Sequence, residues 1–210
     1  TSVGRILESG RARGQSTLLL AKCFPDTRIV SIDYEPGTED AETAESRLVP
    51  CENVALRYGD SRKLLPELVE PDDVVLIDGP KGFRAVRLAL RLFSGRRAPR
   101  AAFLHDLYEG TPERAFLRQA VPDALYSDAA EFVECCRDLD EPCWSKMRGQ
   151  SGENGRQPYL FKGCTQASYG PTMALLRREH VRNPHMLQLQ LCVIDTIGRF
   201  RKSLRKRRSH

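Results

Sequence analysis

Short apolar runs alternate with helical patterns through the first half of the chain. Runs rich in Val, Ile and Leu that end in glycine or an acid predict strands over residues 4–8, 27–33, 53–60, 72–79 and 100–106. Helical patterns follow over residues 15–24, 38–49, 61–69, 82–93 and 111–121, the second of which is an acidic, helix-permissive segment. Strands that alternate with helices favour an α/β fold, with a doubly wound, mostly parallel sheet and helices on both faces.

Four of these helices carry more specific expectations. In the first, Leu18, Leu19 and Leu20 are too apolar for a surface and are expected to be buried. In the third, Pro66 is expected to interrupt the helix. The fourth has an apolar stripe and a basic stripe, formed by Val86, Ala89, Leu90 and Phe93 and by Arg84, Arg87 and Arg91. The fifth begins with Thr111 as its N-cap and Pro112 in its first turn.

The second half of the chain has weaker patterns. It predicts a helix over 127–136, a loop over 147–158 and a strand over 157–164. Helices are expected over 171–180 and 186–200. A chain of 210 residues fits one domain, which we place at 1–198, followed by a basic tail at 199–210.

The tail decides the sign of the net charge. The stretch from Arg199 to Arg208 holds seven cations, and without them the net charge of +5 would become −2. Such a run could contact an anionic membrane surface or phosphates, or could simply be solvated. Phe200 is the one aromatic residue within it, which argues against nucleic acid as a partner. No apolar run approaches the ~20 residues that cross a bilayer.

The seven cysteines form no C-x-x-C pair, so a structural zinc site is not expected. They are Cys23, Cys51, Cys135, Cys136, Cys143, Cys164 and Cys192. Those from Cys135 to Cys164 could form disulfides in an oxidising compartment, but reduced, partly buried thiols are the favoured interpretation. The compartment stays open between the cytosol, slightly favoured, and the secretory lumen. The oligomeric state stays open as well.

The first predicted strand runs into the loop Glu8-Ser-Gly10-Arg-Ala12-Arg-Gly14. Small residues at every second position allow a sharp turn close to a ligand. A dinucleotide fingerprint G-x-G-x-x-G fails at two positions, and the Gly-Lys-Ser/Thr of a P-loop is absent. Acid-x-G-x-G-x-G fits better, with Ala12 in place of the middle glycine. This loop resembles the first motif of class I S-adenosylmethionine-dependent methyltransferases. The resemblance covers residues 4 to 120 and implies a Rossmann-like fold.

Further acids stand where the next strands end. In this family, the acid at Asp33 would accept hydrogen bonds from the ribose hydroxyls, and Asp60 would lie near the adenine. For each acid the alternative is a helix N-cap. The resemblance implies a cofactor half at 1–120 and an acceptor side at 121–198. The implied cofactor residues are Glu8, Ser9, Gly10, Gly14, Ser16, Thr17, Asp33, Tyr34, Asp60, Ser61, Asp78 and Gly79. Arg11 or Arg13 could pair with the methionine carboxylate, although we expect both to point into solvent.

The chemistry is expected where the fourth and fifth strands end. His105 and Asp106 are the predicted acid–base pair, with the carboxylate holding the histidine tautomer. The alternative makes His105 a strand-end residue and Asp106 a helix cap. Lys81 would orient a hydroxyl or acidic substrate, or be a solvated lysine. Metal-dependent O-methyltransferases carry acids at the positions of Asp78 and Asp106, but a hard cation needs more oxygen ligands than these two, so a divalent metal is not favoured.

The expected reaction is methylation of oxygen on a small-molecule or saccharide hydroxyl. The segment DVVLIDGPKGF…AFLHD is similar to the glucuronoxylan O-methyltransferase-like proteins, which implies a sugar or other hydroxyl acceptor. N-methyltransferases often carry Asp/Asn-Pro-Pro-aromatic where this chain has Asp78-Gly-Pro-Lys. The residues Trp144, Tyr159, Phe161 and Tyr169 could line an acceptor pocket or pack in a core. Two alternatives are a nicotinamide-dependent oxidoreductase and a non-catalytic binding domain on the same fold.

Overall fold

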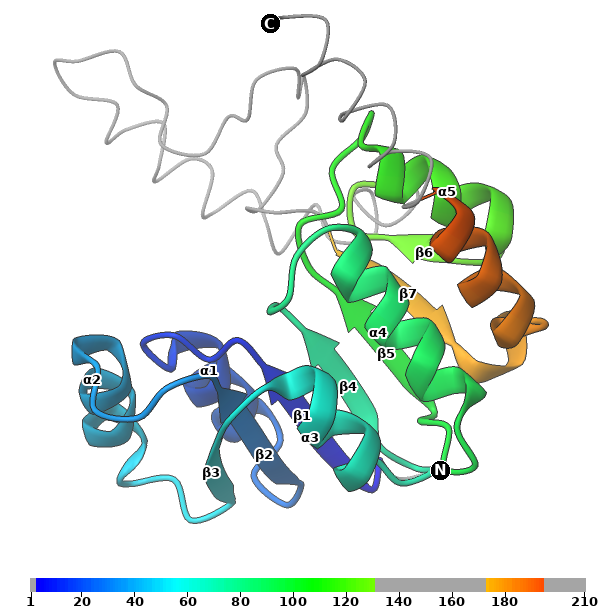
Figure 1. Ribbon diagram of the computed structural model, residues 1–210. Coiled ribbons are helices and arrows are strands. Elements are labelled where there is room, and N and C mark those ends of the chain that lie inside the picture. Colours follow the sequence, from blue (N-terminus) through cyan, green and yellow to red (C-terminus); the bar gives the residue numbers. More distant parts are fainter. Residues whose placement is uncertain (1–2, 131–172, 195–210) are drawn as a thin grey trace, which may run out of the picture.

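A seven-stranded sheet in the order β3-β2-β1-β4-β5-β7-β6 organises the computed structural model, which describes residues 3–130 and 173–194 (Figure 1). Its strands are β1 (Arg5–Ser9), β2 (Arg28–Asp33), β3 (Val54–Tyr58), β4 (Val74–Ile77), β5 (Ala101–Leu104), β6 (Leu125–Tyr126) and β7 (Ala174–Arg177). The first five strands run parallel to one another, whereas β7 is antiparallel to both β5 and β6. The predicted mostly parallel, doubly wound sheet is confirmed.

Helices cover both faces of this sheet, as the sequence predicts. They are α1 (Gln15–Cys23), α2 (Glu39–Leu48), α3 (Ser61–Leu68), α4 (Phe83–Ser94), α5 (Pro112–Ala120), the short 3₁₀ helix η1 (Arg178–His180) and a helix through residues 184–194. Successive strand residues point to opposite faces. Ile6 therefore packs in a small core with α1 and α2, while Leu7 belongs to the larger core under α3, α4, α5 and the helix at 184–194. Figure 1 shows α3 and α4 in front of the sheet.

The five strands and five helices predicted before residue 122 all lie close to the expected bounds. The interruption at Pro66 is wrong, because α3 continues through that residue. Proline has no amide hydrogen for the carbonyl four residues earlier, that of Arg62. Here the Arg62 carbonyl accepts a hydrogen bond from Arg91 Nη1 on α4 at 3.1 Å instead. The neighbouring helix thus compensates for the proline.

The burial expected of the leucines in α1 is wrong for one of the three. Leu19 is 64% exposed, and Leu18 and Leu20 are half-buried. Residues of a helix advance by about 100° each, so three in a row cannot all face one sheet. Thr17 and Ala21, four residues apart, are the positions that α1 buries. The stripe predicted for α4, in contrast, is buried throughout.

The helix predicted over 171–180 is wrong. Residues 174–177 form β7, and η1 follows it. Ala174 and Leu176 are buried with the alternation of a strand, and they pair with Leu104 and Ala102 of β5. The sheet edge left by β5 therefore decides the conformation of this short segment. The two-residue strand β6 is not predicted from the sequence.

The predicted helix at 186–200 is confirmed as far as residue 194, where the described residues end. Predictions for 131–172 and for the tail lie outside the described residues, as do Cys135, Cys136, Cys143 and Cys164. Cys51 is buried, whereas Cys23 and Cys192 are exposed. None of the helices in the described part of the chain has the length and hydropathy of a membrane span.

Candidate functional site

The loop from Gly10 to Gly14 lies at the carboxyl end of β1, beside the turn that follows β4. Gly10 has φ of 87°, and a Cβ there would lie 2.6 Å from the Gly79 amide nitrogen. Glycine is therefore required both by the backbone conformation and by the close approach. Ala12, where the motif has its middle glycine, also takes a positive φ of 45°.

A buried hydrogen-bond cluster supports this loop from behind. The Glu8 side chain is fully buried and accepts hydrogen bonds from the hydroxyls of Ser16, Thr17 and Ser31. These three bonds satisfy the carboxylate that burial would otherwise leave uncompensated. The predicted cofactor role of Glu8, Ser16 and Thr17 stays a prediction, and from this position it would be indirect.

The expectation that both loop arginines point into solvent is wrong for Arg11. Its side chain is 2% exposed, donates to the Ser31 carbonyl at 2.8 Å and places its guanidinium 4.7 Å from the centre of the Tyr58 ring. Nε and Nη2 have no hydrogen-bond partner among the described residues. The ring face of Tyr58 therefore supplies part of the compensation for the buried charge. Arg13 does point outward, where it pairs with Asp40 at 2.7 Å.

Six of the predicted cofactor residues line one crevice of about 260 Å³ at this edge of the sheet: Gly10, Asp33, Tyr34, Asp60, Ser61 and Gly79. Arg62 and Arg84 also line it, and sequence reasoning missed both as site residues. Arg84 belongs to the basic stripe of α4, and a helical stripe gives no sign that this position opens onto the crevice. Ser9 and Ser61 donate to the Gly79 carbonyl at 2.6 and 3.1 Å and so hold the turn after β4 in place.

Asp33 lines this crevice and caps no helix, because Thr38 is the N-cap of α2. Its Oδ2 accepts from the Ala12 amide at 2.6 Å, and its Oδ1 accepts from the Tyr34 amide at 2.6 Å. A carboxylate oxygen can accept more than one hydrogen bond. Asp33 can therefore hold the glycine loop and still accept from a diol in the crevice.

Asp60 does follow the capping alternative. Its side chain accepts from the Arg62 amide at the start of α3 and forms an ion pair with the Arg62 guanidinium at 2.8 Å. The hydrogen bonds from Arg62 lower the pKa of Asp60 to about 2. This carboxylate lines the crevice, but much of its accepting capacity is already used.

A second cluster, which we call the carboxylate–histidine cluster, lies where β4 and β5 end. It consists of Asp78, Lys81, His105 and Asp106. His105 Nδ1 lies 2.6 Å from Asp78 Oδ1 and 3.4 Å from Asp106 Oδ1. Two atoms at 2.6 Å need a shared proton, and His105 Nδ1 donates it to the carboxylate. The Nε2 atom of His105 has no partner among the residues that the structure describes.

Lys81 joins the cluster from the loop after β4. Its ammonium contacts both carboxylates, with Asp106 Oδ2 at 2.5 Å and Asp78 Oδ1 closer still. Burial alone would raise the pKa of Asp78, but hydrogen bonds from His105 and Lys81 outweigh burial and lower it. Burial would lower the pKa of Lys81, and its bonds to Asp106 and Asp78 raise it instead. Asp78 and Lys81 are therefore both charged near neutral pH.

Tyr108 completes this cluster, although no sequence motif marks it as a site residue. Its hydroxyl donates to Asp106 Oδ1 at 2.9 Å, and burial together with this bond raises the pKa of Tyr108 to about 12. The capping alternative for Asp106 is wrong, because Thr111 is the N-cap of α5. Asp106 instead takes φ of 62°, an uncommon conformation for a residue with a side chain.

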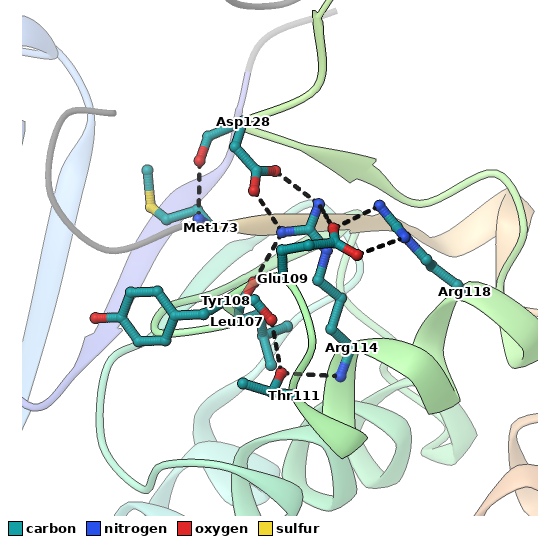
Figure 2. A network of polar contacts seen from close by, with 9 residues as sticks. Leu107, Tyr108, Glu109, Thr111, Arg114, Arg118, Asp128 and Met173 are labelled. Carbon is teal, nitrogen blue, oxygen red and sulfur yellow. Dashed lines mark hydrogen bonds and ion pairs between the residues drawn. The ribbon is translucent and has the colours of Figure 1, made fainter. Parts of the chain in front are cut away.

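The loop after β5 that carries these residues is held by Arg114 of α5 (Figure 2). Arg114 donates to the Leu107 carbonyl at 3.1 Å and forms two hydrogen bonds with Asp128, at 2.6 and 2.7 Å. Figure 2 shows Glu109 between Arg114 and Arg118, and it pairs with them at 3.1 and 2.8 Å. The loop is thus tied to α5 and to the segment after β6.

A larger apolar cavity of about 620 Å³ lies on the sheet face beside α1. Ile6, Leu76, Phe103 and Leu175 of four strands line it, together with Leu20 of α1. None of the predicted site residues does. The aromatic residues proposed for an acceptor pocket, Trp144, Tyr159, Phe161 and Tyr169, lie outside the described residues.

Similar structures include the N-terminal domain of EvdMO1, solved in the presence of SAH and D-fucose, with 27% identity, TM-score 0.38, and 49% of this chain and 43% of that chain covered. An rRNA methylase from Streptococcus thermophilus has 12% identity, TM-score 0.46, and coverages of 84% and 87%. A putative O-methyltransferase from Klebsiella pneumoniae has 21% identity, TM-score 0.43, and coverages of 82% and 72%. With TM-scores below 0.5, these likenesses assign no function. The chain spans less than half the length of EvdMO1's N-terminal domain.

A family model described as "Methyltransferase domain" matches residues 7–107. This range includes the residues that line the crevice and the four residues of the carboxylate–histidine cluster. No curated protein matches the chain in a sequence comparison. The matched family consists of methyltransferases and gives no support to the nicotinamide-dependent alternative. Together with the fold and the strand-end site, this match identifies residues 7–107 as a methyltransferase domain of the class I, Rossmann-like type.

Proposed function

We propose that this chain is an S-adenosylmethionine-dependent O-methyltransferase that acts on a hydroxyl group of a small molecule or saccharide. One observation carries the proposal: the turn Asp78-Gly79 contributes both to the crevice and to the carboxylate–histidine cluster. Gly79 lines the crevice, while Asp78 holds His105 by its ring nitrogen. A ligand in the crevice and a hydroxyl beside His105 would therefore meet across a single turn.

The residues of the crevice fit the cofactor. Asp33 can accept from a ribose diol while it holds the loop, and Gly10 lines the crevice without a side chain that would fill it. Ile32 and Pro80 add apolar lining for a flat ring. Bound there, S-adenosylmethionine would supply the methyl group, which passes from its sulfonium sulfur to the acceptor oxygen and leaves the sulfur as a neutral thioether.

His105 would take the proton of the acceptor hydroxyl. Because Nδ1 donates to Asp78, the lone pair of His105 lies on Nε2, the atom with no partner among the described residues. The negative charge of Asp78 stabilises the imidazolium that forms. Asp78 is thus the group that orients His105, in place of the sequence neighbour Asp106.

Two further observations support oxygen as the acceptor and the placement of the cofactor half. The turn after β4 is Asp78-Gly-Pro-Lys and lacks the first proline and the aromatic residue that N-methyltransferases often carry there. The crevice and the carboxylate–histidine cluster consist of residues before 120. We therefore propose a cofactor half at 1–120 and an acceptor side at 121–198.

Calorimetric titration with S-adenosylhomocysteine tests the proposal directly. Asp33→Ala should lower the affinity at least about tenfold, because a hydrogen-bonded carboxylate contributes ~1.5–3 kcal/mol. Asp26→Ala is the matched control, an exposed acid before the opposite end of β2, and should bind as the wild type does. Unchanged affinity in Asp33→Ala, or no binding by the intact chain, would overturn the cofactor assignment.

Turnover gives the second arm of the test. Transfer of radiolabelled methyl groups should be followed with panels of polyhydroxylated and of amine acceptors. His105→Gln should keep S-adenosylhomocysteine binding and lower turnover about 10²-fold or more, the usual contribution of a positioned base. Equal rates in His105→Gln and the wild type would remove His105 from the mechanism, and transfer to amines alone would refute oxygen as the acceptor.

A further inference from the structure

The carboxylate–histidine cluster has the donor atoms of a divalent cation site. Ligand atoms of Asp78, His105 and Asp106 all lie within 4.8 Å of one another. Two carboxylates and an imidazole suit several divalent metals, among them Mn²⁺. The sequence resemblance also places a metal-binding pair at Asp78 and Asp106. Whether this chain can hold such an ion depends on what lies between those atoms.

The ammonium of Lys81 lies at the point where the three donors converge. Nζ contacts Asp78 Oδ1, lies 2.5 Å from Asp106 Oδ2 and lies 3.3 Å from His105 Nδ1. A divalent ion bound by the same oxygens would need this volume, and its charge would repel the ammonium. The position that a metal would take is therefore filled by a side chain of the protein.

The tautomer of His105 also argues against a bound metal. Nδ1 faces the cluster and uses its proton in the 2.6 Å hydrogen bond to Asp78. A ring nitrogen that carries a proton has no lone pair for a metal. Without the lone pair of His105 Nδ1, only the two carboxylates remain as donors, and both are already paired with Lys81. The native cluster does not fit a divalent metal.

We propose that Lys81 is a built-in cation that takes the place of a divalent metal ion between Asp78, His105 and Asp106. Its single positive charge leaves the two carboxylates with a net charge of −1. The exclusion of the metal does not rest on the proposed function, because it follows from the positions of Lys81 and the two carboxylates.

The inference predicts that removal of the amine creates a metal site. Lys81→Met keeps an unbranched side chain and removes the charge. Its matched control is Lys22→Met, at an exposed lysine in the last turn of α1. Mn²⁺ binding should be measured by the loss of the free-ion electron paramagnetic resonance signal and by calorimetry. We expect one Mn²⁺ per chain in Lys81→Met, bound at least about tenfold more tightly than in the wild type or Lys22→Met.

A double variant locates the ion. Asp106→Asn in the Lys81→Met background should abolish the new Mn²⁺ binding, since a ligating carboxylate is lost. Wild-type binding of Mn²⁺ that Asp106→Asn removes would overturn the proposal, and so would a folded Lys81→Met chain that binds no ion. Circular dichroism checks the fold, and Lys81→Gln serves as the second variant if Lys81→Met does not fold.

Activity provides a separate readout. Once an acceptor is found, wild-type turnover should be unchanged by a chelator, while Lys81→Met should lose turnover and regain part of it with Mg²⁺ or Mn²⁺. Chelator inhibition of the wild type would overturn the built-in cation. If no acceptor is methylated at all, the proposed function fails, and the Mn²⁺ measurements still decide the role of Lys81.

Discussion

The ion pair between Arg114 and Asp128 determines how firmly the loop after β5 is held, and Arg118 on the same helix provides a matched control. Both arginines lie against the Tyr126 ring, with guanidinium-to-centre distances of 4.3 and 5.7 Å, and both pair with Glu109. They differ in burial, since Arg114 is 3% exposed and the Arg118 side chain is 52% exposed. Replacement of each by Met therefore compares a buried with an exposed ion pair.

The expected magnitudes follow from that difference. Loss of one partner from a buried pair costs about 3–5 kcal/mol, because the other charge stays buried. The Asp128 side chain keeps 18% exposure, so about 3 kcal/mol is expected for Arg114→Met. An exposed pair contributes about 0.2–1 kcal/mol, which sets the cost of Arg118→Met.

Urea denaturation and calorimetric melting measure both variants. For a chain of this size 1 kcal/mol shifts Tm by about 2–4 °C, so Arg114→Met should lower Tm by about 6–12 °C and Arg118→Met by at most about 4 °C. Addition of Asp128→Asn to Arg114→Met should cost little more, since the ion pair between Arg114 and Asp128 is already lost. Stability losses in the two single variants that agree within about 1 kcal/mol would refute the assignment of the buried pair.

Two further predictions concern the crevice. Gly10→Ala should destabilise the chain and weaken S-adenosylhomocysteine binding, because the left-handed φ costs about 1–2 kcal/mol and the contact with the Gly79 backbone about 1–3 more. Gly37→Ala is the control, because Gly37 has φ of 70° and an added Cβ would have nothing within 4 Å. Calorimetry should show only the cost of the left-handed φ in this variant. Equal losses of stability in the two variants would exclude a clash at Gly10. Asp60 has its pKa lowered from 3.8 to about 2 by Arg62, so its stabilising effect is present above pH 3.8 and is lost as the pH falls through 2. Acid unfolding should therefore be less steep in that range for Asp60→Asn, and identical pH profiles would contradict the ion pair.

Local patterns predicted the first half of the fold well, because each element there is decided by its own residues. The four-residue run of β4 is bounded by acids, and the stripe from Val86 to Phe93 has helical spacing and is buried throughout. Crossover helices then bury both faces of the strands between them. The fold class could therefore be predicted from the alternation of strand and helix patterns alone.

The wrong predictions concern segments whose conformation is decided by distant partners. The segment at 174–177 has two adjacent leucines, which fit a helix or a strand, and pairing with β5 decides for the strand. Pro66 remains helical because Arg91 of another helix serves the carbonyl of Arg62. Arg11 is buried because Tyr58, 47 positions later in the chain, provides a ring face for it. No local pattern carries information of this kind.

The site shows why its residues could be predicted from the sequence, whereas their hydrogen-bond partners could not. Sequence adjacency suggested that Asp106 orients His105, whereas Asp78 lies nearer. Ile77 and Leu104 are register partners in the parallel pair β4–β5, so the next residues, Asp78 and His105, leave the sheet side by side. Neighbours along an extended strand point to opposite faces, while neighbours across strands point the same way. Strand register, which a single sequence does not reveal, thus assigns the histidine to the acid of the adjacent strand, and the same turn brings Lys81 to both.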